Sequence, residues 1–67
     1  MEDIIIDGVT YDLVTRTTID GINYVVFEDE EGIYVCEYVV QNDEIFFKTI
    51  SDEMEDKVLN TLGIDYE

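Results

Sequence analysis

Carboxylates dominate the side chains of this chain that could do chemistry. The 67 residues include 18 Asp and Glu against three basic residues and no His, which gives a net charge of −15. Two carboxylates can act as general acid and general base only where their environments push their pKa values apart. No spacing in the sequence marks such a pair, and without His the usual base near neutral pH is missing. We therefore expect no enzymatic activity.

The two other candidate nucleophiles have structural explanations. Cys36 lies within an apolar stretch that is typical of a strand interior, where a thiol without a cationic neighbour or a base is inert. Ser51 is the only serine, and it precedes a run of acids in the manner of a helix N-cap. A single Cys excludes an internal disulfide and, with no His present, a soft-metal site.

The acidic run at residues 28–32 resembles a calcium loop only superficially. An EF-hand loop needs acids at positions 1, 3 and 5 before its Gly at position 6. With Gly32 at position 6, position 1 is Phe27, so the pattern fails. We expect the weak divalent-cation binding of any strongly acidic chain, and neither a dedicated metal site nor a cofactor.

The charge also limits the cellular partners of this chain. Three cations cannot build the basic face that direct binding to nucleic acid requires, and an anionic membrane surface would repel the chain. No apolar run approaches the roughly 18 residues of a membrane span, and Met1-Glu2-Asp3 lacks the basic start of a signal peptide. We expect a cytoplasmic protein, in a bacterial cell or a phage-infected host.

Alternating apolar residues and two Asp-Gly turns position these side chains on strands. The pairs Asp7-Gly8 and Asp20-Gly21 each separate two apolar runs, which is a strong hairpin signal. Strands are expected at residues 4–6, 9–19, 22–28, 33–40 and 44–50. The length allows one domain, residues 1–67, with strands over about 3–50, a helix over about 52–62 and a short tail over 63–67.

The last segment changes to a helical period. Met54, Val58 and Leu62 recur every four residues with Leu59 beside them, which predicts one apolar stripe packed on the sheet. The resulting fold is α+β, an antiparallel meander of four to five strands with one C-terminal helix on one face.

Both ends of the expected helix carry capping signals. Ser51 is the expected N-cap, and a capping box from Asp52 to Glu55 is the alternative. With Gly63 as the C′ residue, Ile64 should contact Leu59 in a Schellman motif.

One helix cannot cover both faces of the sheet. Val25 and Phe27, with one set of residues from the fourth strand, place apolar groups on the second face. Either the sheet curls on itself or this face meets a partner.

The order of these features resembles the small acidic YrzB-like family of bacterial proteins, a domain of unknown function. The resemblance covers roughly residues 4–60. It implies the α+β fold and a bacterial or phage origin, and it carries over no activity or site. The matching stretches are Ile6-Asp7-Gly8 with Tyr11, Asp20-Gly21 with Tyr24-Val25-Val26, the acidic turn ending at Gly32, and Ile50-Ser51-Asp52-Glu53-Met54-Glu55.

The size of the charge suggests a binding function. Solubility of a small domain needs a net charge of about 2–8 in magnitude, and −15 is well beyond this. A rigid display of carboxylates can occupy a basic nucleic-acid-binding groove in place of phosphates, as in the phage-type DNA-mimic inhibitors that are similar in charge and size. Anti-CRISPR and anti-restriction proteins are examples, and the expected partner is a protein with such a basic surface. The candidate contacts are Glu28, Asp29, Glu30 and Glu31 on a turn, and Asp52, Glu53, Glu55 and Asp56 on the helix.

Each group of candidate acids also has a simpler explanation. The turn acids fit an ordinary solvated loop, and the helix acids fit capping and stabilisation of the helix dipole. In the alternative function, an uncharacterised bacterial housekeeping module binds a partner, or a second copy of itself, through the apolar second face. The anchors would then be Phe27, Tyr34, Tyr38 and Phe46, although core packing is the simpler explanation for any single one of them.

Overall fold

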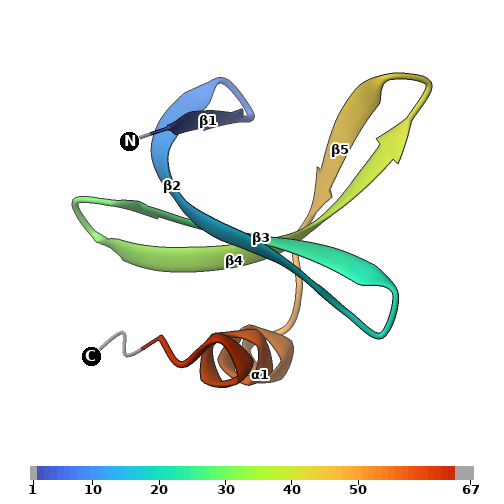
Figure 1. The fold of residues 1–67 in the computed structure, drawn as a ribbon. Helices are drawn as coiled ribbons and strands as arrows, with labels where there is room; N and C mark the ends of the chain where they lie inside the picture. The colour runs from blue at the N-terminus through green and yellow to red at the C-terminus, as the bar shows by residue number, and fades with distance from the viewer. Residues whose placement is uncertain (1, 65–67) are drawn as a thin grey trace.

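Five antiparallel strands and a C-terminal helix form the fold in a computed structural model that describes residues 2–64 (Figure 1). The strands pair in chain order, which makes the sheet a meander and confirms the expected α+β architecture. Residues 65–67 of the expected tail lie outside the described residues. The elements are β1 (Asp3–Ile6), β2 (Val9–Ile19), β3 (Ile22–Asp29), β4 (Gly32–Gln41), β5 (Glu44–Lys48) and α1 (Asp52–Leu62).

Several strand boundaries differ from the expected ones by one or two residues. β5 ends at Lys48 rather than Ile50, because Ile50 leaves the sheet to pack against the core beside α1. β3 continues to Asp29 and β4 begins at Gly32, so the turn between them contains only Glu30 and Glu31. Most of the acidic run at 28–32 is therefore strand.

Three of the four hairpins have two-residue turns with positive φ at both residues. Asp7-Gly8, Asp20-Gly21 and Asn42-Asp43 all have this conformation, and Asn42 and Asp43 have φ of 51° and 66°. This type I′ geometry matches the right-handed twist of the flanking strands. The two Asp-Gly turns are confirmed.

The helix starts at the expected residue. The Ser51 Oγ accepts a hydrogen bond from the Met54 amide at 3.2 Å, so Ser51 is the N-cap. The alternative capping box from Asp52 is wrong, because Asp52 already lies inside the helix.

The C-terminal end of α1 is the expected Schellman motif. Gly63 adopts a left-handed conformation with φ of 73°, which Gly allows without a steric penalty. Its amide donates to Asn60 O, and the Ile64 amide donates to Leu59 O at 3.0 Å. Ile64 also packs against the core cluster that contains Leu59.

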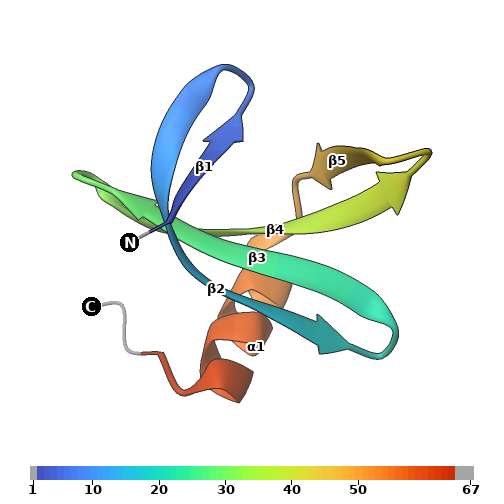
Figure 2. The same ribbon diagram turned by 45° about the horizontal axis from the view of Figure 1, so that its top comes forward.

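The sheet has a core on each face. On one face α1 contributes Val58 and Leu59, which pack with Tyr24, Val26 and Val35. In Figures 1 and 2 the helix lies on this side of β3 and β4, while the β1–β2 and β4–β5 hairpins rise on the other side.

Curling of the sheet covers the second face. Val25, Phe27 and Cys36 are buried there beneath residues of the outer strands, among them Ile4 on β1 and Phe47 on β5. Part of the bend comes from a β-bulge at Val14, where the register of β2 against β3 shifts between Leu13 and Thr15. We expected either a curled sheet or a partner to cover the apolar second face. The structure shows a curled sheet.

Candidate functional site

The predicted contact acids fall into two separate groups. Glu28 and Asp29 end β3, and Glu30 and Glu31 form its turn to β4, at the far left of Figures 1 and 2. The four helix acids belong to the first turns of α1, which follow β5 and lie near the middle of both views. The eight acids thus belong to two separate segments of the fold.

Asp29 holds the β3–β4 turn together. Its Oδ1 accepts hydrogen bonds from the amides of Glu31 at 2.8 Å and Gly32 at 3.2 Å, and from the Tyr34 hydroxyl at 3.2 Å. Partial burial, with the Asp29 carboxylate next in importance, raises the pKa of Tyr34. Asp29 therefore stabilises the β3–β4 turn, and Glu30 and Glu31 lie at the tip of that turn.

Two acids outside the predicted set lie beside Glu28. Asp3 on β1 pairs directly with Asp12 on β2, and Asp12 pairs directly with Glu28 on β3. Directly paired residues project from the same face of a sheet, and neighbouring strands are about 4.8 Å apart. Asp3 and Asp12 are exposed and Glu28 is half-buried. We call these three residues the acidic row.

The acidic row is continuous with the turn. Glu30 follows Glu28 by two residues, and both Glu30 and Glu31 are exposed. Five carboxylates thus gather at one corner of the sheet, and we call this set (the acidic row with Glu30 and Glu31) the acidic corner.

Strand register is what makes the acidic row hard to find in the sequence. Asp3 and Asp12 are nine residues apart, and the two-residue turn at Asp7-Gly8 is enough to pair them. Regular pairing of β2 with β3, counted from the two-residue turn at Asp20-Gly21, would place Asp12 opposite Asp29. The bulge at Val14 shifts this pairing by one residue, to Glu28.

The helix acids have the environment of a helix N-terminus. Asp52, Glu53 and Glu55 lie in the first turn, where the helix dipole favours negative charge. Partial burial raises the pKa of Glu55, and the charges of Asp52 and Asp56 raise it further. Glu55 also lines a cavity of about 240 Å³ that Lys48 shares. The dipole thus favours the charges of Asp52 and Glu53, whereas burial and the neighbouring acids disfavour the charge of Glu55.

Three of the four alternative aromatic anchors lie on the second face of the sheet, and the fourth, Phe46, does not. Phe27 is buried against Tyr11, with ring centroids 4.7 Å apart, and stacks on Tyr34 at 5.6 Å. Tyr38 is half-buried on the same face of the sheet. Phe46 is 46% exposed and projects from the other face of β5 than Phe47. Three of the four anchors thus contribute to the core of the curled sheet.

Cys36 is buried, and burial raises the pKa of its thiol to about 11, so the thiolate needed for nucleophilic attack is scarce at neutral pH. Within residues 2–64, no three His, Cys, Asp or Glu side chains are grouped so that they could hold a metal ion.

Over the same described range, no helix has the length and apolar character to cross a membrane.

Comparisons with protein-family models, with curated proteins and with solved structures find no match to this chain. The resemblance to the YrzB-like family therefore rests on the sequence motifs given above.

Proposed function

We propose that this chain is a non-enzymatic, acidic protein-binding domain that occupies a basic, nucleic-acid-binding surface of a partner protein. The acidic row carries this proposal. Like charges at directly paired positions of neighbouring strands destabilise a sheet. Asp3 pairs with Asp12, and Asp12 pairs with Glu28, so the row contains two such pairs. Because the row destabilises the fold, we attribute its presence to binding of a partner and not to folding.

The spacing of the carboxylates supports substitution for phosphates. The Cβ atoms of directly paired residues lie about 4.5–5.5 Å apart, so the row presents three negative charges in a closely spaced line, as a run of phosphates does. Glu30 and Glu31 extend this charge beyond the edge of the row. Because Asp29 and the strand pairing hold the backbone, a partner's Lys and Arg side chains would meet carboxylates that are already in position.

The whole surface adds attraction at long range. The accessible area of 4960 Å² carries 15 net negative charges, or one for roughly 330 Å². A field of this sign steers the protein toward basic surfaces and repels acidic ones. Binding through the acidic corner would compete with nucleic acid for the partner and would weaken as salt screens the charges.

A pull-down from bacterial lysate, eluted in salt steps and read by mass spectrometry, tests the proposal. The expected result is a DNA- or RNA-binding protein that elutes between 50 and 500 mM salt and whose binding to labelled nucleic acid is inhibited by the domain. A partner that stays bound through high salt, or self-association alone, would contradict it.

A pair of charge-matched variants localises the contact. Glu30→Lys with Glu31→Lys should abolish capture of the partner. Glu44→Lys with Glu53→Lys makes the same change in net charge at two other exposed positions and should retain it. Equal loss in both variants would show that net charge alone, and not the acidic corner, determines binding.

A further inference from the structure

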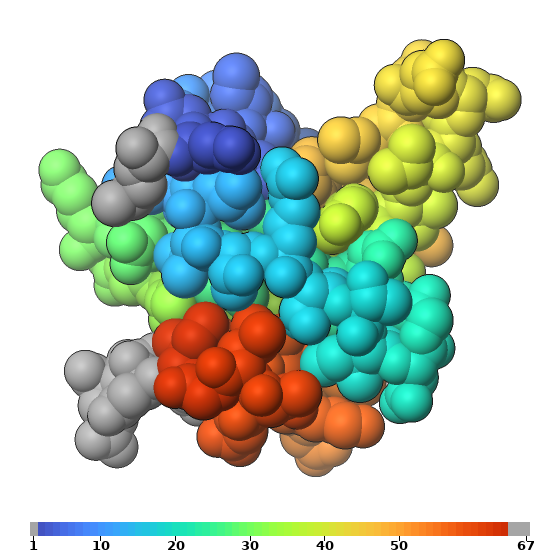
Figure 3. Space-filling view, in the orientation of Figure 1, coloured from blue at the N-terminus to red at the C-terminus, as the bar shows by residue number. Residues whose placement is uncertain are grey.

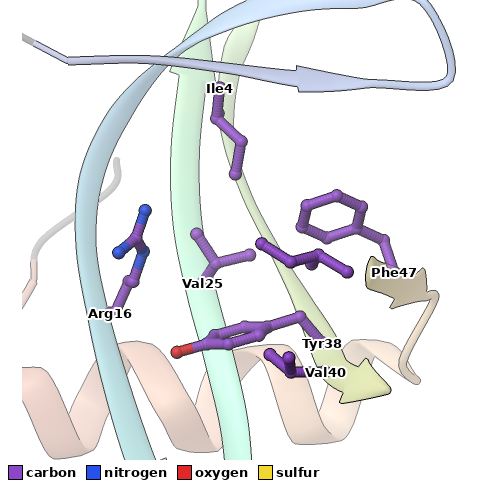
Figure 4. A pocket seen from close by; sticks show the side chains of 7 residues that line it. Ile4, Arg16, Val25, Tyr38, Val40 and Phe47 are labelled. Carbon is purple, nitrogen blue, oxygen red and sulfur yellow. The ribbon is translucent and has the colours of Figure 1, made fainter. Parts of the chain in front are cut away.

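A groove lies on the second face of the sheet, the concave side of its curl, where it borders the core of that face, and no residue of the acidic corner lines it. Its volume is about 250 Å³ (Figure 4). Ile4, Val25 and Phe47 form part of its apolar lining, and Val40 and Ile45 extend this lining onto the β4–β5 hairpin. Val40 and Ile45 are 57% and 55% exposed, on a hairpin that projects from the body of the molecule at the upper right of Figure 3.

Two polar side chains, Arg16 and Tyr38, complete the lining of the groove. Among the residues that the structure describes, no acidic side chain lines it, although the chain has 18 acids and only three basic residues. Figure 4 shows the Arg16 guanidinium and the Tyr38 hydroxyl on the β2–β3 side, with Val40 and Phe47 on the side of β4 and β5. The groove thus has a cationic end and an apolar end.

The bulge at Val14 is what aims Arg16 into the groove. Before the bulge, Tyr11 and Leu13 project to the concave face of the sheet. Strict alternation would continue this face with Thr15, but the shifted register pairs Arg16 with Val25, a residue of the concave core. Bulges commonly re-aim a side chain next to a binding site. One of three cations is thereby turned toward an apolar surface.

We infer that this groove binds a small amphiphilic carboxylic acid. The Arg16 guanidinium would hold the carboxylate by two parallel hydrogen bonds, and the Tyr38 hydroxyl would donate a third. The alkyl chain would lie along Val40, Ile45 and Phe47, whose exposed area it would cover. A groove of about 250 Å³ has room for a short alkyl chain, for which octanoate is a suitable probe.

The net charge of the protein does not exclude an anion from this site. The Debye length at physiological ionic strength is about 8 Å, so exposed acids beyond that distance are largely screened. Arg16 would contact the carboxylate at a distance well below the Debye length, so this attraction would be screened less than the repulsion from the distant acids. An alkylamine of the same length would meet Arg16 with a like charge and should bind poorly, although the net charge would attract it.

Titration of the ¹⁵N-labelled protein with sodium octanoate at 150 mM salt, followed by NMR, tests this site. Saturable shifts are expected at Arg16, Tyr38 and Ile45 and not in α1. Acetate lacks the chain and octylamine lacks the anionic head, so both should leave these signals in place. Equal or stronger binding of octylamine would overturn the inference.

Two other occupants are distinguished by the same signals. Shifts at the groove that grow with protein concentration alone would assign it to a second copy of the chain. Tighter binding of a short peptide that ends in Leu with a free carboxylate would assign it to a protein C-terminus. Either result would overturn the assignment to a small free acid.

Substitution of Arg16 tests the contribution of the cation to binding separately from that of the apolar surface. Arg16→Gln should weaken octanoate binding by about 10-fold or more, as expected for the loss of a charged hydrogen-bond partner, and Arg16→Lys should bind at an intermediate level. Lys57→Gln makes the same charge change on an exposed residue of α1 and should bind as the unchanged protein does. Unaltered binding by Arg16→Gln with an intact spectrum would show that Arg16 does not recognise the acid.

Discussion

Tyr34 donates its hydroxyl hydrogen to the same carboxylate oxygen of Asp29 that accepts two backbone amides of the β3–β4 turn. The ring of Tyr34 stacks on Phe27 in the concave core, with centroids 5.6 Å apart. The turn that presents Glu30 and Glu31 is therefore anchored to the interior of the molecule. Asp29, a candidate partner contact from its sequence position, is the acceptor that makes this anchor.

Replacement of Asp29 by Ala should destabilise the fold more than replacement of the adjacent Glu30. The Asp29→Ala variant loses three accepted hydrogen bonds, and we expect a loss of about 1–2 kcal/mol in the free energy of unfolding. Urea denaturation followed by circular dichroism measures this difference. Glu30→Ala is the control and should be as stable as the unchanged protein or slightly more stable. Equal stability of the two variants would contradict the role of Asp29.

Glu55 should make the protein more stable at mildly acidic pH. Its pKa is raised in the folded state, first by partial burial and then by Asp52 and Asp56, so the folded state binds a proton more readily than the unfolded chain. A raised folded pKa contributes stability below the unfolded pKa of about 4.3, and this contribution is lost as the pH rises through the folded value. The free energy of unfolding should therefore increase as the pH falls from 7 toward 5.

The matching variant is Glu55→Gln, which removes the charge and keeps the shape. It should be more stable than the unchanged protein at pH 7, and its stability should depend less on pH. Glu53→Gln, at an exposed position in the same turn, should keep the original pH dependence. Urea unfolding of the three proteins at pH 5 and pH 7 measures this, and a Glu55→Gln variant that is less stable at pH 7 would show the sign to be wrong.

Gly63 should tolerate no side chain without a cost. Its φ of 73° is left-handed, where a Cβ is strained, although no atom lies within 4 Å of the position that the Cβ would occupy. Gly63→Ala should therefore lose about 1 kcal/mol through backbone conformation alone. For a domain of this size, this loss lowers Tm by about 4–8 °C. An unchanged melting temperature would show that the Schellman motif does not limit stability.

The elements of the fold could be predicted because each has a local signal. The Asp-Gly turns fix two hairpins, Ser51 and Gly63 mark the two ends of α1, and the helical period from Met54 to Leu62 identifies its buried side. Each signal depends only on residues a few positions apart, so it can be read without the tertiary structure.

The candidate sites could be predicted only in part, because the pairing of β2 with β3 and the direction of Arg16 depend on one irregular residue. The bulge at Val14 pairs Asp12 with Glu28 and turns Arg16 to the concave face. Neither Gly nor Pro marks this position, and the β-branched run around it is compatible with a regular strand. Without the bulge, the sequence pattern leads to a wrong register between β2 and β3, and therefore to wrong β3 partners for Asp12 and Leu13.

The acidic row should be separable from the stability of the fold by removing its charges. Asp3→Asn with Asp12→Asn keeps the shape of both side chains and relieves the repulsion along the row, which should increase the free energy of unfolding at low salt by about 0.5–1 kcal/mol. Salt screens the same repulsion, so the gain should shrink when urea denaturation is repeated at 500 mM salt. The variant should also bind its basic partner less tightly, because two of the contact carboxylates are gone. Greater stability with weaker binding identifies the row as a functional surface, whereas greater stability with unchanged binding would leave only Glu30 and Glu31 as the contact.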